Sequence, residues 1–309
     1  MTPSSAPPWA RRAATKPSWK SSIGPQAGVS VGALYHHFAD KEALLEALMP
    51  RYGEKVASAR YDRIGRGYAS TRREDPRLAR QIDEALGHAR TVVNVGAGAG
   101  SYEPRDRHVV AIEPSDVMAA QRPPQLAPAI AASAGRLPLR DRSVDAAMAV
   151  LTLHHWDAEL EPGVRELRRV ARDVVVIVTY DAEVSGRMWL MAEYLREVAR
   201  MDHRIFPSID RLVAWLGGDA EVRAVPIPRD TPDWTLGSFW AHPERVLDAS
   251  ARAATSGFAR MDPAVVAQVV DSVGRDLASG AWDRRHGELR HANSFDAGLR
   301  LIVSRPHGH

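Results

Sequence analysis

The chain has 309 residues, of which 45% are hydrophobic and 26% charged, with no cysteine and a formal net charge of +3 at pH 7. This length can bury one large core, and the missing thiols exclude disulfides, thiolate metal sites and a cysteine nucleophile. No apolar run approaches the roughly 20 residues of a membrane span, and the N-terminus has no signal-peptide core, so we expect a cytoplasmic protein without a membrane partner.

The N-terminal residues differ in composition from the rest of the chain. Residues 1–26 contain five prolines, scattered basic side chains and no apolar periodicity, which predicts a disordered tail. Residues 1–39 hold four basic residues and no acid, so the remainder of the chain carries −1 (3 − 4). The basic character therefore gives little support to a nucleic-acid-binding body. All four lysines precede residue 56, which places a domain boundary near residue 58.

Segment 27–58 contains Ala27-Gly-Val-Ser-Val-Gly-Ala-Leu-Tyr-His-His-Phe-Ala-Asp-Lys41. This sequence resembles the second half of the helix-turn-helix domain of TetR-family repressors. The resemblance implies DNA contacts for Tyr35, His36 and Lys41. A helix-turn-helix also needs a first helix across the DNA backbone, and the Pro-rich upstream segment predicts none. We therefore expect an incomplete fragment without a DNA partner. A TetR-like DNA-binding transcriptional regulator is the alternative function.

From residue 59 onward, helical and strand patterns alternate. Val- and Ile-rich runs of strand length, expected where a sheet is covered on both faces, are separated by helical segments. The predicted strands are 91–95, 108–113, 129–133, 145–151, 173–179, 222–227 and 299–304. The predicted helices are 76–86, a short one capped by Ser115, 159–170, 186–200 and 208–216. Residues 228–297 form a helical insertion. Residues 59–309 are thus predicted to form a Rossmann-like α/β domain. It has a seven-stranded, mostly parallel sheet with helices on both faces and a helical cover, beside a short helical N-terminal segment.

The ends of the first two strands predict a nucleoside site. The first strand leads into Gly96, Gly98 and Gly100, and glycine permits positive φ and a close approach of the backbone to a ligand. The second strand ends in Glu113, where a carboxylate can bind the two hydroxyls of a ribose. The spacing is G-x-G-x-G, and Ser101 stands where the dinucleotide fingerprint has its third glycine. An NAD(P)-dependent oxidoreductase is therefore a second alternative function, but a less favoured one because Ser101 replaces this third glycine.

Four further blocks follow the glycine loop in order: Glu113-Pro-Ser, Ala134-Gly-Arg-Leu-Pro-Leu, Ser143-Val-Asp-Ala-Ala-Met and Leu151-Thr-Leu-His-His-Trp. With the loop, they resemble the class I S-adenosylmethionine-dependent methyltransferases, and more narrowly the bacterial group called methyltransferase type 11. The resemblance covers about eighty residues. It implies S-adenosyl-L-methionine as cofactor and a small-molecule methyl acceptor as partner. No Asn/Asp-Pro-Pro-Tyr/Phe motif follows the fourth strand, which disfavours methylation of DNA bases.

The resemblance also implies which residues bind the cofactor: Gly96, Gly98, Gly100, Glu113, Pro114, Met118, Ser133, Ala134 and Leu151. One position departs from the family. Before Leu-Pro the family usually has an acid that accepts a hydrogen bond from the adenine amino group, and this chain has Ser133-Ala134-Gly135. Ser133 can accept that bond more weakly than a carboxylate does.

Methyl transfer is an in-line displacement in which the protein mainly holds the reacting groups in line. A general base is needed only where the acceptor must lose a proton. His154 and His155 after the fourth strand are the catalytic candidates, because histidine titrates near neutral pH. Tyr180 and Asp181 after the fifth strand are further candidates. The alternative is that one histidine packs and the other faces solvent. Trp156 is expected in the core, and no His-Glu-x-x-His spacing indicates a metal site.

Overall fold

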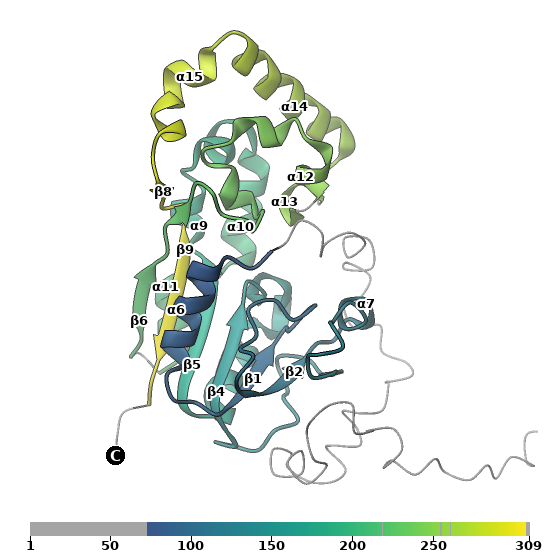
Figure 1. Cartoon of the computed structure of the whole chain (residues 1–309), viewed down its shortest axis with the longest axis vertical. Coiled ribbons are helices and arrows are strands. Elements are labelled where there is room, and N and C mark those ends of the chain that lie inside the picture. The colour runs from purple at the N-terminus through teal and green to yellow at the C-terminus, as the bar shows by residue number, and fades with distance from the viewer. Residues whose placement is uncertain (1–72, 218, 254, 260, 307–309) are drawn as a thin grey trace, which may run out of the picture.

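The computed structural model describes residues 73–217, 219–253, 255–259 and 261–306 (Figure 1). Its centre is a seven-stranded sheet in the order β3-β2-β1-β4-β5-β9-β6. The strands are β1 (Thr91–Val95), β2 (His108–Ile112), β3 (Ala129–Ile130), β4 (Val144–Val150), β5 (Ala171–Tyr180), β6 (Glu221–Ala224) and β9 (Leu299–Ser304). The first five are parallel, and β9 runs antiparallel to β5 and β6. The predicted α/β fold class is confirmed. The predictions for residues 1–26, 27–58 and 59–72 lie outside the described residues.

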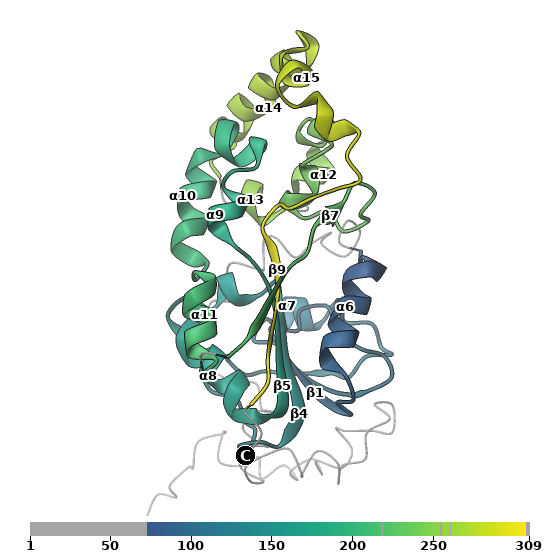
Figure 2. The same ribbon diagram turned by 90° about the vertical axis from the view of Figure 1, so that its left-hand side faces the viewer.

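Helices cover both faces of the sheet because successive strand side chains point to opposite sides. On β5, Val174, Val176 and Val178 belong to one buried cluster, and Val175 and Ile177 belong to another. The first cluster includes α6 (Pro76–Leu86), and the second includes α8 (Leu160–Val170) and α11 (Ile209–Trp215). Figure 2 shows these helices on opposite sides of the sheet. The near-continuous Val and Ile of β5 follow from burial on both faces.

Several helices begin at a residue whose side chain accepts a backbone hydrogen bond, as N-capping residues do. Asp75 accepts from the Arg77 amide at the start of α6, where Pro76 takes the first helical position. Ser115 caps α7 by accepting from the Met118 amide, as predicted. The remaining helices are α7 (Asp116–Ala119), α9 (Ala182–Ser185), α10 (Arg196–Ile205), α12 (Ala249–Ala253), α13 (Ser256–Ala259), α14 (Pro263–Ala278) and α15 (Ala281–His286).

Three predicted elements differ from the structure. The strand predicted over 129–133 is shortened to β3, Ala129–Ile130. The single helix predicted over 186–200 is replaced by one π-helical turn over Leu190–Tyr194, followed by α10 from Arg196. Residues 188–191 are all buried, and four successive buried side chains do not fit one face of a regular α-helix. The strand predicted over 222–227 ends at Ala224, because Pro226 has no amide hydrogen for the ladder. The chain then forms β7 (Ile227–Pro228), which pairs with β8 (Ser294–Phe295) instead.

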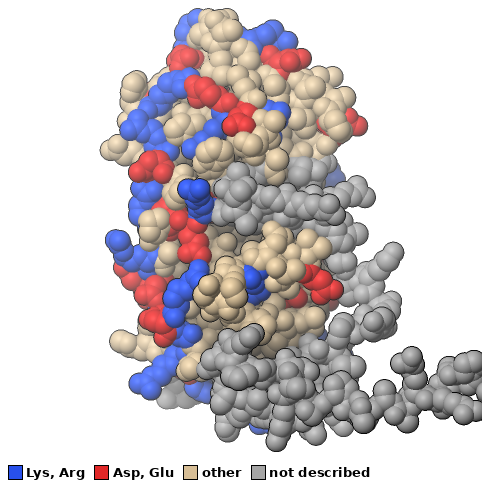
Figure 3. All heavy atoms as spheres, turned by 45° about the vertical axis from the view of Figure 1, so that its right-hand side comes forward, with Lys and Arg blue, Asp and Glu red and all other residues tan. Residues whose placement is uncertain are grey.

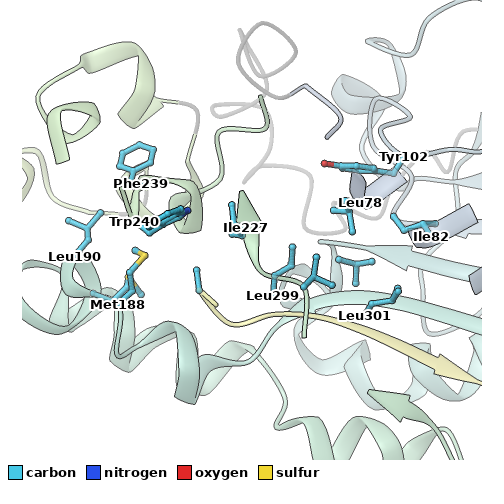
Figure 4. Packing of buried hydrophobic residues seen from close by; sticks show 14 of the residues in the cluster. Leu78, Ile82, Tyr102, Met188, Leu190, Ile227, Phe239, Trp240, Leu299 and Leu301 are labelled. Atoms are coloured by element: carbon cyan, nitrogen blue, oxygen red, sulfur yellow. The ribbon is translucent and has the colours of Figure 1, made fainter. Parts of the chain in front are cut away.

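Beyond the carboxyl ends of the strands lies a helical cap, formed by residues 182–205 and 228–297 (Figures 1 and 2). Its core contains Trp189, Trp240 and Trp282, each at most 3% exposed. The Trp189 indole N–H donates to the Trp240 carbonyl oxygen at 2.9 Å. The same buried cluster continues past Ile227 and Leu299 to α6 (Figure 4). The cap and one face of the sheet therefore share one hydrophobic core. No helix in the described part of the chain is both long and apolar enough to cross a membrane.

Candidate active site

A first cavity of about 340 Å³ lies at the carboxyl ends of β1, β2 and β4. Parallel strands place their carboxyl ends at one edge of the sheet, so residues far apart in sequence meet there. Its lining includes eight of the nine residues predicted to bind the cofactor: Gly96, Gly98, Glu113, Pro114, Met118, Ser133, Ala134 and Leu151. His155 and Trp156 also line it. Gly100 and His154 are not among the described lining residues.

The glycine loop has the backbone that the sequence predicts. Gly96, Gly98 and Gly100 have φ of 71°, 52° and 95°. A Cβ on Gly96 would lie 2.0 Å from Thr152 Oγ1, so a glycine there lets the end of β1 pack against the chain after β4. A Cβ on Gly100 would lie 2.1 Å from Leu126 Cδ1. Gly100 therefore acts in packing the loop against Leu126.

Glu113 is 8% exposed at the end of β2 and is held by two backbone amides. One carboxylate oxygen accepts from the Gly98 amide at 2.8 Å, and the other accepts from the Ser115 amide at 2.9 Å. Burial raises the pKa of Glu113 above its ordinary value of 4.5, and the backbone hydrogen bonds oppose that rise in part. Each oxygen has a second lone pair, so the carboxylate can accept further hydrogen bonds from a ligand in the first cavity.

A buried ion pair beneath the loop does not follow from any sequence motif. The Arg122 guanidinium donates to both carboxylate oxygens of Glu103, at 3.0 and 2.8 Å, and to the Gly98 carbonyl oxygen at 3.3 Å. The Asn94 amide nitrogen donates to Glu103 at 2.9 Å. The side chains of Arg122 and Glu103 are 4% and 0% exposed. The one sequence signal was the polar Asn94 inside a Val-rich strand, since buried polar groups need partners.

The two predicted catalytic histidines lie in a 3-10 turn, Leu153–His155, and have different surroundings. Their ring centroids are 3.8 Å apart. His155 lines the first cavity, whereas the His154 ring stacks on Phe206 with centroids 4.7 Å apart. Trp156 is 8% exposed and packs over Gly163, where a Cβ would lie 2.6 Å from its ring. Trp156 thus belongs to the core, as predicted, and also lines the first cavity.

A second cavity of about 320 Å³ lies between the sheet edge and the helical cap. Tyr102 and Leu151 line both cavities. Both have positive φ, 63° and 53°, which is uncommon for residues other than glycine and is often found at functional sites. The other described lining residues include Asp75, Leu78, Tyr180, Val225, Ile227, Thr231, Asp233, Thr235, Ser294 and Leu299.

Hydrogen bonds connect the walls of the second cavity. The Tyr102 hydroxyl accepts from the Asp75 amide at 3.1 Å and donates to Asp233 at 2.9 Å. The hydroxyls of Tyr180 and Thr235 are 2.8 Å apart. Of the two further candidates after β5, Tyr180 therefore lies in the second cavity. Asp181 caps α9 by accepting from the Glu183 amide, and it is not among the described lining residues of either cavity.

The chain is similar to two known families. Residues 93–178 match the family described as methyltransferase domain, and residues 21–48 match bacterial regulatory proteins of the tetR family. Both resemblances seen in the sequence are thereby confirmed. None of the curated proteins matches the chain.

Two solved structures are similar to the chain. One is a protein of Anabaena variabilis, provisionally named as a methyltransferase from an antibiotic biosynthesis pathway. It is 30% identical with a TM-score of 0.70, over 76% of this chain and 98% of its own. The other is phosphoethanolamine N-methyltransferase 2 of Haemonchus contortus in complex with S-adenosyl-L-methionine. It is 14% identical with a TM-score of 0.50, over 82% of this chain and 60% of its own, a likeness of fold.

Proposed function

Since this chain belongs to the S-adenosylmethionine-dependent methyltransferases, we propose that it transfers a methyl group to a small organic acceptor bound in the second cavity. The observation that carries this proposal is the meeting of the two cavities at Tyr102 and Leu151. A donor in the first cavity and an acceptor in the second would face each other there. Holding two reactants in one line is the largest contribution that a protein makes to this kind of displacement.

The residues of the first cavity fit S-adenosylmethionine. Its ribose hydroxyls are donors that match the buried Glu113 carboxylate, and the Gly98 backbone leaves room beside Met118, whose methyl carbon would be 3.4 Å from a Cβ at that position. Met118, Ser133 and Ala134 would form the wall around the base. When bound, the cofactor supplies an electrophilic methyl group on a positively charged sulfur. The aromatic face of Trp156 in the same lining is favourable to a cation.

The second cavity supports an acceptor of small size and mixed polarity. Leu78, Ile227 and Leu299 give it apolar walls, and the hydroxyls of Tyr102 and Tyr180 give it polar groups. The cap contributes Pro228, Thr231, Asp233, Thr235 and Ser294 to its lining. We therefore infer that the cap determines which acceptor is accepted, and that it excludes water from the reacting groups.

Where the acceptor must lose a proton, His155 and Tyr180 are the side chains placed to receive that proton or to orient the acceptor. His155 lines the first cavity and Tyr180 the second. A neutral imidazole accepts a proton near pH 7, whereas a phenol does so only when its pKa is lowered. We therefore assign the base role to His155 and a positioning role to Tyr180.

The tetR-family match at residues 21–48 raises the question of DNA binding. A DNA-binding surface typically gathers basic side chains on one face. On the face shown in Figure 3, basic and acidic side chains of the described residues alternate. We propose that residues 27–58 are a fragment that takes no part in methyl transfer, and that residues 59–309 form the catalytic domain.

The test is calorimetric titration of the full chain with S-adenosylhomocysteine and with NAD, followed by measurement of S-adenosylhomocysteine release with a panel of small alcohols, amines and carboxylic acids. We expect binding of S-adenosylhomocysteine, no binding of NAD, and turnover with some members of the panel. Binding of NAD alone would refute the proposal.

A further inference from the structure

Gly135 and Glu159 pack directly against each other beside the first cavity. A Cβ on Gly135 would lie 3.2 Å from Glu159 Cβ and 3.3 Å from both Cγ and Cδ. The Glu159 side chain thus runs along its whole length over the bare backbone of Gly135. The φ of Gly135 is not in the left-handed region, so its backbone does not require glycine. Glycine is favoured at this position because the Glu159 side chain occupies the space beside it that a Cβ would need.

Glu159 also lines the first cavity, next to Ser133 and Ala134. It is half-buried, at the residue before α8 begins. Its amide donates to the Trp156 carbonyl oxygen at 2.8 Å. Within the described part of the chain, its carboxylate makes no hydrogen bond and no ion pair. A carboxylate held in this way against a cavity wall is a candidate acceptor for a hydrogen bond donated by a ligand.

The order of the strands indicates which part of a nucleoside faces Glu159. The sheet runs β3-β2-β1, with the glycine loop after β1 and Glu113 after β2. The chain after β3 lies next to the end of β2 and lines the same cavity as Glu113, so it is a wall available to the base of a nucleoside whose ribose is held there. That chain is Ala132–Ala134, which lines the first cavity and leads into Gly135. Glu159, packed on Gly135, stands at this end of the first cavity.

We propose that the Glu159 carboxylate accepts a hydrogen bond from the exocyclic amino group of the cofactor's adenine, and that Gly135 makes the room for it. The inference rests on the proposed binding of S-adenosylmethionine in the first cavity. An ionised carboxylate only accepts hydrogen bonds, whereas the Ser133 hydroxyl both donates and accepts. Glu159 can therefore distinguish the amino group of adenine from the carbonyl oxygen of hypoxanthine, and Ser133 cannot. Glu159 replaces Ser133 as the acceptor expected from the sequence.

The experiment compares S-adenosylhomocysteine with S-inosylhomocysteine, which has a carbonyl oxygen in place of the amino group, by calorimetry on the full chain. We expect the wild type to bind S-inosylhomocysteine about tenfold more weakly, the size of one hydrogen bond to a charged group. Glu159→Gln keeps the shape of the side chain but offers a donor. It should bind S-adenosylhomocysteine about tenfold more weakly than the wild type does, and it should lose the preference between the two compounds.

The control is Glu161→Gln. Glu161 lies two residues further along, and its side chain is 45% exposed in an ion pair with Arg165. The Glu161→Gln variant should bind S-adenosylhomocysteine and S-inosylhomocysteine with the same affinities as the wild type does. Gly135→Ala is a second variant, in which the new methyl group displaces Glu159 without removing its charge. It should weaken S-adenosylhomocysteine binding and reduce the preference.

Two results overturn the inference alone: a wild type that binds both compounds equally, or a Glu159→Gln variant that keeps the wild-type preference. A wild type that binds neither compound refutes the proposed function itself.

Discussion

The Tyr102 hydroxyl donates to Asp233 Oδ2 at 2.9 Å across 131 positions of the sequence. Tyr102 ends the glycine loop, and Asp233 lies in the helical cap, shortly after β7. Their exposed fractions are 5% and 6%. The same hydroxyl accepts from the amide of Asp75, the residue that caps α6. One side chain therefore joins the cofactor loop, the first described helix and the cap.

Tyr102→Phe should lower both stability and turnover. It removes a hydrogen bond to a buried carboxylate, a loss of about 1.5–3 kcal/mol in the free energy of unfolding. Because Tyr102 lines both cavities, kcat should fall while the affinity for S-adenosylhomocysteine changes little. Urea unfolding and acceptor kinetics give the two readouts.

Tyr194→Phe is the matched control for Tyr102→Phe. Tyr194 also donates to a carboxylate, that of Asp276, but it is not among the described lining residues of either cavity. The control should lower stability and leave kcat unchanged. Equal losses of kcat in the two variants would contradict a specific role for Tyr102.

The affinity for S-adenosylhomocysteine should fall on acidification toward pH 4.5. In the proposed site the ionised Glu113 carboxylate would accept the ribose hydroxyls. Burial raises the pKa of Glu113 above its ordinary value of 4.5, so it takes up a proton at a higher pH than an exposed glutamate does. The same raised pKa has the opposite sign for folding. The folded chain binds this proton more tightly than the unfolded chain, so this group adds stability as the pH falls through its folded pKa.

Glu113→Gln tests this assignment by calorimetry at a series of pH values. The variant should bind S-adenosylhomocysteine about 1.5–3 kcal/mol more weakly at neutral pH. Its affinity should then stay level over the range in which the wild type weakens. If wild type and variant show the same pH profile, another group is responsible.

Gly96→Ala should destabilise the fold by more than its backbone strain alone. The left-handed φ of 71° costs about 1–2 kcal/mol for a residue with a Cβ. That Cβ would also lie 2.0 Å from Thr152 Oγ1. Gly280→Ala, at φ 69° with only the end of the Arg284 side chain near, at 3.4 Å, should show the backbone cost alone. Thermal unfolding of both variants measures the difference. Similar melting temperatures would mean that Thr152 moves aside freely.

Alanine substitutions of the two histidines should have different effects on turnover and on stability. His155→Ala should lower kcat by about 100-fold or more where the acceptor must lose a proton, with a smaller effect on S-adenosylhomocysteine affinity. His154→Ala should instead lower stability by about 0.5–1.5 kcal/mol through loss of the stacked contact with Phe206. Kinetics and chemical unfolding on both variants test the assignment. Equal effects on kcat would show that the pair acts together.

Removing residues 1–55 should leave S-adenosylhomocysteine affinity unchanged. The composition break and the absence of a predicted first helix argue against a complete DNA-binding head. A gel shift of the full chain against the DNA upstream of its own gene, at fixed salt, is the companion measurement. A discrete complex that survives competitor DNA would establish residues 21–48 as a working domain.

Local patterns predicted the sheet well. The runs 91–95 and 108–113 match β1 and β2 to within one residue, because the apolar runs and the turns that bound them are local features. Residues 76–86 match α6 because Asp75 and Pro76 mark its start. The π-helical turn over Leu190–Tyr194 was missed. It depends on which side chains the cap buries, and no window of the sequence contains that information.

The site shows the same division. The strand pattern brings Gly96, Gly98 and Glu113 to one cavity, because parallel strands place consecutive strand ends at one edge. Tyr102, Asp233 and Glu159 were missed, since each acquires its position from an element distant in sequence. In the sequence, Gly135 only belongs to the segment in which the family's acid is missing. Its role depends on the Glu159 side chain, which packs over it.

The hydrophobic cluster that runs from α6 through Ile227 and Leu299 to Trp240 limits how this enzyme can be re-engineered. A cap with a separate core could be exchanged between homologues as a cassette. Here the cap shares its core with one face of the sheet, so its removal would expose that face. Calorimetry should therefore register a single melting transition for both parts. New acceptor preferences are therefore expected from point substitutions in the wall of the second cavity, at Thr231, Thr235 or Ser294, rather than from grafted caps.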